Sequence, residues 1–348
     1  MNSRVLLGMS GGVDSSVAAV LLKNAGYEVV GVTLKLVPDE FGSEGEAAAR
    51  DAGEIAGLLG IEHHVIDLED EFRKSVMTDF AAKYLEGKTP NPCVICNQKI
   101  KFGRMMDIAD KLCCDYLATG HYARCELDEQ SGNYLLKRAP HSKDQSYFLY
   151  TLPQPTLRRV IFPLGKLTKQ EVREIAQAHS LPVSSKRDSQ DICFVQSGKH
   201  AEFIKAFTGE CDRAGNFVSE NGEILGKHKG IIHYTIGQRK GLGIALGSPR
   251  FVTKINPASN EVTLGESESL MTSELTIKSL CFTLPNEQSE IEAQVKIRFA
   301  AQPSAATITM LGDGRAKIVF REKQRAITAG QSAVFYDGDT VLGGGEIE

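Results

Sequence analysis

The sequence lacks a long apolar run, and this absence argues against a membrane-spanning helix. No stretch of about eighteen apolar residues, the length that a spanning helix needs, occurs in the chain. The apolar run that follows Arg4 is also too short for the core of a signal peptide. We therefore expect a cytoplasmic protein without a membrane partner.

The chain also lacks a strong excess of one charge, an internal repeat and a low-complexity tract. Its formal net charge of -4 does not advertise a nucleic-acid partner, but a local basic surface can still bind one. A length of 348 residues suggests two or three domains. Eight cysteines in such a chain are expected to be reduced, catalytic or metal-bound rather than a disulfide framework.

The first glycine-rich turn lacks the lysine of a P-loop. A short apolar strand precedes the glycines, and a helical pattern follows them. The backbone of Gly11 and Gly12 and the hydroxyls of Ser10 and Ser15 suit a phosphate at a helix N-terminus. Because no Gly-Lys-Ser/Thr follows, we expect a metal ion to offset the phosphate charge, with Asp14 as its nearest ligand.

Strands and helices alternate through the first part of the chain, which predicts an α/β domain with a parallel sheet and ligands at the carboxyl ends of its strands. We expect this domain at 1–197, with a capped helix starting at Thr168. A turn-rich segment at 198–267 predicts a small central domain. From 268 to 348, short strands separated by turn dipeptides are typical of a small barrel or sandwich.

Three cysteines lie in polar surroundings. Cys93 and Cys96 fall in a segment expected to be a loop, and their spacing lets both reach one ion or each other. Cys193 lies on a second polar stretch. Nearby positive charge lowers the pKa of a thiol, and the neighbouring cations are Lys99, Lys101, Arg104, Lys186 and Arg187. A zinc knuckle, a redox pair and two buried apolar cysteines all fit the first spacing.

The run from Ser10 to Ser15 resembles the pyrophosphatase loop of the N-type ATP pyrophosphatases, which cleave ATP to AMP and pyrophosphate while adenylating an acceptor. With six further motifs in the same order, the whole chain resembles the tRNA-specific 2-thiouridylases. The other motifs are at 91–97, 118–122, 143–147, 192–194, 237–243 and 330–336. The resemblance implies an adenine nucleotide α-hydrolase-like N-terminal domain, a small central domain and a C-terminal β-barrel.

The resemblance also implies a reaction, in which sulfur replaces the C2 oxygen of the wobble uridine, position 34 of tRNA. The O2 atom attacks ATP, pyrophosphate leaves, and a sulfur nucleophile then displaces AMP. Cys193 is implied to carry a persulfide and Cys96 to act as a nucleophile, ending as a Cys96–Cys193 disulfide, while Asp14 assists catalysis. The residues implied to bind ATP, with Mg2+, are Gly8, Met9, Ser10, Gly11, Gly12, Val13, Asp14, Ser15, Leu34 and Gly120. Those implied to contact tRNA are Asn91, Pro92, Cys93, His121, Lys143, Asp144, Gln145, Arg298, Phe299 and Gln331.

Several alternatives stay open at this point. Some family members have aspartate where this chain has Cys93, so Cys93, Cys96 and Cys193 are also candidate ligands of a 4Fe–4S cluster whose open iron holds sulfide. A second interpretation is a superfamily synthetase that adenylates and amidates a small molecule. A third is a zinc-stabilised tRNA-binding factor, with His200 as the fourth ligand. The sequence does not name the sulfur donor, the tRNA isoacceptors or the oligomeric state.

Overall fold

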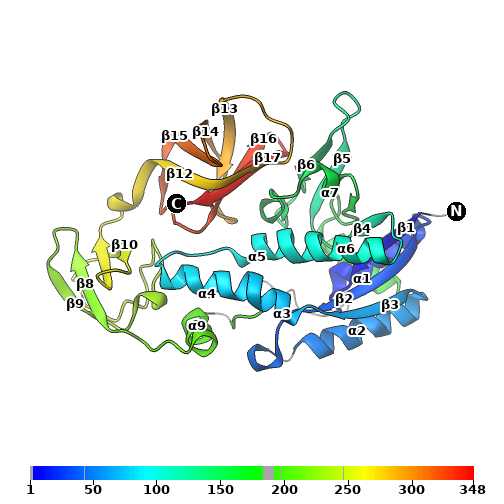
Figure 1. Ribbon diagram of the computed structural model, residues 1–348, viewed down its shortest axis with the longest axis horizontal. Coiled ribbons are helices and arrows are strands. Elements are labelled where there is room, and N and C mark those ends of the chain that lie inside the picture. The colour runs from blue at the N-terminus through cyan, green and yellow to red at the C-terminus, as the bar shows by residue number, and fades with distance from the viewer. Residues whose placement is uncertain (1–2, 43, 183–191, 197, 246) are drawn as a thin grey trace.

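Three sheets make up the computed structural model, which describes residues 3–42, 44–182, 192–196, 198–245 and 247–348 (Figure 1). A five-stranded parallel sheet lies in the N-terminal part, a four-stranded sheet in the middle part, and a closed barrel at the C-terminal end. The predicted fold class is confirmed. Among the helices of the described ranges, none has the length and apolar character that a membrane span requires.

The N-terminal sheet has its first strand at the centre. The order is β3-β2-β1-β4-β7, and all neighbours are parallel. The strands are β1 (Arg4–Gly8), β2 (Glu28–Lys35), β3 (Glu62–Asp67), β4 (Tyr116–Ala118) and β7 (Val160–Ile161). The chain builds β2 and β3 on one side of β1 and then crosses to β4 on the other side. Ligands of open α/β sheets bind at such a switch point, outside the carboxyl ends of the strands.

Helices cover both faces of this sheet (Figure 1). The helices of this part of the chain are α1 (Val13–Asn24), α2 (Glu44–Leu59), α3 (Glu69–Phe72), α4 (Thr78–Leu85), α5 (Pro92–Ile95), α6 (Met105–Lys111), α7 (Gln154–Leu157) and α8 (Lys169–Ala178), with the π-helices η2 (Arg73–Met77) and η3 (Cys96–Arg104). Of these, α1, α2 and α8 share one core with the sheet, and η3 and α6 share the other. The predicted cap of α8 is confirmed: the Glu171 amide donates to Thr168 Oγ1 at 3.3 Å, and the Thr168 amide donates to Glu171 Oε2 at 2.7 Å.

The segment that carries Cys93 and Cys96 is helical, so the expected loop there is wrong. α5, η3 and α6 follow one another directly from Pro92 to Lys111. Proline suits the first helical position because its missing N–H has no partner there in any case. The π-helical turn begins at Cys96, and such turns are frequent at functional sites.

The middle part has a small core of its own. Its sheet has the order β10-β11-β8-β9, and the helix α9 (His200–Thr208) precedes it. The strands are β8 (Gly215–Ser219), β9 (Ile224–His228), β10 (Phe251–Asn256) and β11 (Glu261–Gly265). Phe217, Val252 and Val262 are fully buried within it.

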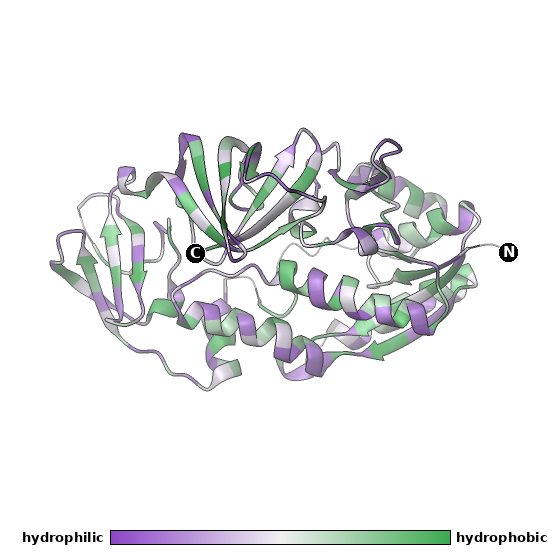
Figure 2. Cartoon of the chain, turned by 45° about the horizontal axis from the view of Figure 1, so that its top comes forward, coloured by the Kyte–Doolittle hydropathy of each residue, from purple (hydrophilic) through white to green (hydrophobic). Residues whose placement is uncertain are grey.

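Six antiparallel strands form the C-terminal barrel, which the pairing of β12 with β17 closes. They are β12 (Met271–Phe282), β13 (Glu290–Lys296), β14 (Ser304–Gly312), β15 (Arg315–Arg325), β16 (Ser332–Asp337) and β17 (Thr340–Ile347). The hairpins predicted around 312–314 and 337–339 are confirmed. Figure 2 shows hydrophobic and hydrophilic residues mixed along the barrel strands, as expected where one face fills the barrel.

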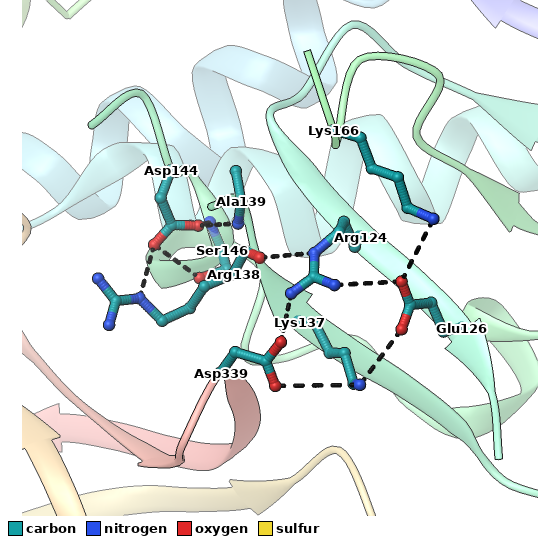
Figure 3. A network of polar contacts seen from close by, with 9 residues as sticks. All are labelled: Arg124, Glu126, Lys137, Arg138, Ala139, Asp144, Ser146, Lys166 and Asp339. Carbon is teal, nitrogen blue, oxygen red and sulfur yellow. Dashed lines mark hydrogen bonds and ion pairs between the residues drawn. The ribbon is translucent and has the colours of Figure 1, made fainter. Parts of the chain in front are cut away.

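A hairpin of the N-terminal part joins the barrel sheet. Its strands are β5 (Ala123–Leu127) and β6 (Tyr134–Arg138), and β6 pairs with β17 at Lys137 and Thr340. Figure 3 shows the polar side of this junction, where Arg124 bonds both Glu126 and Asp339. Beneath it, side chains of both parts share one apolar core, among them Tyr147, Leu149, Val334, Tyr336 and Val341.

Asp144 holds the connection that follows this hairpin. Its buried carboxylate accepts hydrogen bonds from the Ala139 amide, the Ser146 amide and the Ser146 hydroxyl, each at 3.1 Å, and from Arg138 Nε at 3.3 Å (Figure 3). Four donors therefore converge on one side chain, which fixes the turn that leads to Tyr147.

We expect Asp144→Ala to destabilise the protein far more than Asp339→Ala. The first change leaves buried donors without a partner, at a cost of about 3–5 kcal/mol for a broken buried pair. The second breaks ion pairs whose acidic side chain is 49% exposed, and such pairs contribute about 0–1 kcal/mol. Thermal unfolding of the full chain measures the difference, and equal melting temperatures for the two variants would contradict this account.

Candidate active site

The turn after β1 has the geometry of an anion site. α1 begins at Val13 behind Gly12, and no side chain caps it among the described residues. The first amides of a helix have no intrahelical acceptor, so these N–H groups are available to an anion. The Ser10 amide donates to Ser15 Oγ at 3.1 Å, and the Ser15 and Ser16 hydroxyls donate to the Gly12 carbonyl at 3.1 and 2.8 Å. The loop thus keeps its shape through its own hydroxyls.

Two glycines allow the backbone segments around this loop to approach closely. Gly11 has φ +65, and a Cβ there would lie 2.6 Å from the Ala48 carbonyl oxygen of α2. A Cβ at Gly120, after β4, would lie 3.1 Å from the Ser15 nitrogen. The turn after β4 therefore lies directly against the first turn of α1.

Asp14 lies in a polar cluster that the sequence did not predict. Its carboxylate accepts a hydrogen bond from the Tyr122 hydroxyl at 2.7 Å, and Lys169 Nζ lies 2.9 Å from both of its oxygens. Lys169 starts α8, 155 residues further along the chain. Folding therefore brings a lysine to this loop that no nearby stretch of sequence supplies, so the expected metal ion is not the sole candidate for positive charge there. One carboxylate completed by phosphate oxygens is a usual Mg2+ site, and Asp14 fits that role.

The other residues expected to bind ATP lie at the same edge of the sheet. Met9 is buried, and its carbonyl accepts a hydrogen bond from Thr33 Oγ1 at 2.7 Å. Leu34, near the end of β2, is half-buried between two apolar cores. A Cβ on Gly8, at the end of β1, would lie 3.1 Å from the Met105 methyl carbon of α6. The helix that begins with the cysteines therefore passes beside the start of the loop.

Cys96 and Cys193 belong to one neighbourhood although 97 positions separate their numbers in the sequence. Cys96 is buried in an apolar cluster that also holds both neighbours of Cys193, Ile192 and Phe194. The negative charge of either Cys93 or Cys96 would raise the pKa of Cys193, which places all three thiols within electrostatic reach. All three are free thiols; Cys93 and Cys193 reach solvent with part of their side chains, yet protein atoms surround both thiols densely enough to raise their pKa values.

Burial, rather than nearby cations, dominates the acidity of these thiols. Burial raises the pKa of Cys96 to about 11 and the pKa of Cys193 to about 12, while Lys101 opposes the shift at both thiols. The pKa of Cys93 is also raised by burial. The expectation that basic neighbours would favour the thiolates is therefore wrong for this state. Lys186 and Arg187, the other cations invoked, lie outside the described residues.

Neither metal hypothesis finds its ligand set in the described ranges. No three His, Cys, Asp or Glu side chains there lie close enough together to hold a metal ion. His200 stacks on Tyr84 with ring centroids 4.8 Å apart. The described residues therefore do not fit a 4Fe–4S cluster or a four-ligand zinc site as they are arranged, whereas chemistry between two thiols needs no further ligand.

The residues expected to contact tRNA differ in how far they reach solvent. Exposed are Cys93, Arg298 and Phe299; half-buried are Asn91, Lys143, Gln145 and Gln331; buried are Pro92, His121 and Asp144. His121 Nδ1 lies 2.8 Å from Thr119 Oγ1, and burial lowers the His121 pKa well below its usual value, so this ring is neutral at pH 7. Gln331 donates to the Thr89 carbonyl at 2.8 Å, which ties the barrel to the approach to Asn91.

Comparison with known proteins matches every part of this architecture. Family models described as the HUP domain and the PRC-barrel domain of tRNA methyl transferases match residues 3–197 and 201–266, and one described as an aminomethyltransferase β-barrel domain matches 272–347. The tRNA-specific 2-thiouridylase MnmA of Clostridioides difficile (strain 630) is 49% identical over 100% of this chain and 99% of its own length. The chain belongs to the tRNA-specific 2-thiouridylase family.

A second relative gives the same assignment, and the solved structures that match are more remote. The tRNA-specific 2-thiouridylase MnmA of Clostridium botulinum (strain Eklund 17B / Type B) is 47% identical over 99% of this chain and 98% of its own. Among solved structures, the U34-tRNA thiolase NcsA of Methanococcus maripaludis with its [4Fe-4S] cluster is 21% identical, covers 59% of this chain and 65% of its own, and has a TM-score of 0.37. A 4-thiouridine synthetase in complex with RNA and ATP is also 21% identical and has a TM-score of 0.40. The match covers 55% of this chain and 45% of the synthetase chain.

We expect Lys169→Met to lower kcat/KM for ATP about 10- to 100-fold, because a hydrogen bond to a charged group contributes about 1.5–3 kcal/mol. Pyrophosphate release in the presence of tRNA measures the effect. Lys166→Met is the matched control. The Lys166 side chain is 80% exposed, and its ammonium makes a long ion pair, 4.0 Å, with a Glu126 carboxylate oxygen. Equal activity of the two variants would show that Lys169 does not serve the nucleotide.

The raised thiol pKa values predict a steep pH dependence of alkylation. Only the thiolate reacts, so the iodoacetamide rates of Cys96 and Cys193 in the free protein should rise about tenfold per pH unit from pH 7 to 10. Mass spectrometry of the two peptides measures each rate, and glutathione, as a reference thiol, should level off near pH 9. A plateau of either cysteine near pH 8 would contradict the burial argument.

Proposed function

We propose that the protein catalyses ATP-dependent 2-thiolation of the wobble uridine of tRNA. One observation carries the proposal: a single helix, 92–111, links the two halves of the chemistry. Cys96 begins its π-helical turn within the cluster that flanks Cys193, and Met105 contacts Gly8 at the start of the nucleotide loop. Membership in the 2-thiouridylase family assigns this pairing of an ATP loop with two thiols to uridine thiolation.

The first step activates the base. Uridine O2 attacks the α-phosphorus of ATP, a bond forms between these atoms, and the bond from the α-phosphorus to the β-bridging oxygen breaks. Pyrophosphate leaves into the turn formed by Ser10 to Ser15, where the first amides of α1 and the Lys169 ammonium stabilise its charge. Asp14 is the residue that would hold Mg2+, and the ion would supply additional positive charge for the phosphates.

The second step transfers sulfur. The terminal sulfur of a Cys193 persulfide attacks C2, and AMP leaves with the former O2. The Cys96 thiolate then attacks Cys193 Sγ, so that the persulfide S–S bond breaks and the thiocarbonyl forms at C2. The product is a Cys96–Cys193 disulfide, which a thiol reductant must reduce before the next turnover. A donor that carries sulfane sulfur must supply the persulfide. The atoms and electrons of these steps balance without an iron–sulfur cluster. We assign the reaction to the cytoplasm.

Mass spectrometry of tRNA nucleosides tests the proposal. Incubation of the protein with tRNA, ATP, Mg2+, a sulfane-sulfur source and a thiol reductant should add one sulfur to the wobble uridine, with one AMP and one pyrophosphate released per sulfur. We expect Cys193→Ser to abolish thiolation and Cys96→Ser to reduce it at least about 100-fold, which corresponds to about 2.7 kcal/mol. Cys113→Ser, at an exposed thiol outside the cluster, is the matched control and should remain active.

The same assay separates the alternatives. A synthetase that amidates a small molecule would release pyrophosphate without tRNA and would tolerate both serine variants. A zinc-stabilised binding factor would bind tRNA without releasing pyrophosphate. Full thiolation by anaerobically purified, iron-free protein would remove the cluster hypothesis, whereas activity that requires iron and acid-labile sulfide would replace the persulfide step.

A further inference from the structure

A buried cation lies in the seam between the barrel and the N-terminal part. Lys296 ends β13 and pairs with Val334 of β16, and its side chain is buried, with 6% of the residue exposed. Within the described ranges, no acceptor lies within hydrogen-bond or ion-pair distance of its ammonium; the contacts found there are with aromatic rings. Nζ lies 5.7 Å from the ring centroid of Tyr147 and 5.6 Å from that of Phe299.

The nearest acid does not neutralise Lys296. Asp144 acts on it only through space, because four other donors occupy the Asp144 carboxylate. Arg138, which also lies nearby, adds like charge. The ammonium is not sealed from solvent, and no carboxylate pairs with it within the described ranges, so an anion can reach it and gain a charge-assisted contact.

The walls of this site suit a nucleotide. Phe299 is 41% exposed and lies against Phe148 with ring centroids 4.6 Å apart and an interplanar angle of 30°. One face of a paired, solvent-reaching ring is a surface on which an unpaired base can stack. An aromatic surface beside a cation is the usual combination for a single-stranded nucleic acid, which presents bases and phosphates alternately.

The site also connects to the reaction centre. Asn97, next to Cys96, donates from Nδ2 to the Phe148 carbonyl at 3.2 Å. The Tyr147 hydroxyl donates to the Ser332 carbonyl at 2.8 Å and lies close enough to the Asn91 side chain for that amide to lower the Tyr147 pKa against the effect of burial. The residues beside Lys296 therefore contact the same helix and the same approach segment that hold the first two cysteines.

We propose that Lys296 binds a backbone phosphate of the tRNA anticodon loop immediately beside the target uridine, while the neighbouring base stacks on Phe299. This inference rests on the proposed function and adds the group that holds the extruded strand in place. Lys296 is a binding residue from the barrel, so the barrel completes the substrate site. The contact would give a partner to an ammonium that has no carboxylate at ion-pair distance among the described residues.

A cycle that combines a protein change with an RNA change tests the assignment. The probes are anticodon stem–loop RNAs in which a single methylphosphonate neutralises one loop phosphate at a time, and binding to the full chain is measured by fluorescence anisotropy without ATP. Two phosphates flank the uridine. Neutralising one of them should lower the affinity of the wild-type protein for the RNA about tenfold. Lys296→Met should cost about the same on native RNA and be insensitive to neutralisation at that position.

Salt dependence gives an independent readout. Loss of one phosphate contact to a single strand should reduce the slope of log K against log salt by about 0.7 in Lys296→Met. Lys317→Met is the matched control: this barrel lysine is 45% exposed, pairs with Glu274 at 2.8 Å, and should leave both slope and affinity unchanged. Lys296→Gln serves as a second neutral variant if the methionine variant fails to fold.

The outcomes separate this inference from the proposed function. The wild-type protein could thiolate tRNA while neither flanking phosphate shows an effect on affinity that depends on Lys296. That result would overturn the inference and leave the proposed function intact. If neither neutral variant folds, the phosphate-by-phosphate measurement on the wild-type protein decides. Equal affinities with and without each flanking phosphate charge would then overturn the inference. Weaker ATP binding by Lys296→Met in the absence of RNA would assign the phosphate to the nucleotide and reject the RNA contact. Failure of wild type to bind any of the RNAs would instead reject the proposed function.

Discussion

The contact between Gly120 and the first turn of α1 is the constraint on which the rest of the site depends. A Cβ at position 120 would lie 3.1 Å from the backbone of Asp14 and Ser15, so a side chain there would push the turn after β4 and the loop apart by a few tenths of an ångström. This approach carries Tyr122 to Asp14, where its hydroxyl donates at 2.7 Å. The nucleotide loop is thus held from outside as well as by its own hydroxyls.

From that contact a continuous set of hydrogen bonds leads to the barrel. The Tyr122 amide donates to Gln145 Oε1 at 3.0 Å, and the Gln145 amide returns a bond to the Tyr122 carbonyl at 2.8 Å. Asp144 fixes the same turn, and Tyr147 then bonds the barrel at Ser332 at 2.8 Å. Residues implied by family resemblance to contact tRNA, such as Asp144 and Gln145, therefore also hold the two parts of the protein together. Their side chains hold the backbone of this turn from the protein interior.

The thiols show how burial decides reactivity. A cation near a cysteine favours the thiolate, and loss of solvent favours the thiol. At Cys96 and Cys193 the loss of solvent has the larger effect on the pKa. The free protein therefore keeps both sulfurs protonated at neutral pH.

The sequence alone determined the fold class, the position of the phosphate loop and the cap at Thr168, because each depends on residues that are near one another along the chain. Glycine and serine spacing sets a turn, and hydrophobic period sets a strand or a helix. The family resemblance extended this to the cysteine pair and its chemistry. The tertiary structure alone decided that Lys169 reaches Asp14, that Cys93 lies in a helix, and that Lys296 lies among aromatic rings with no carboxylate partner in the described part of the chain. These features depend on strand order and on burial, and neither is a property of any single stretch of sequence.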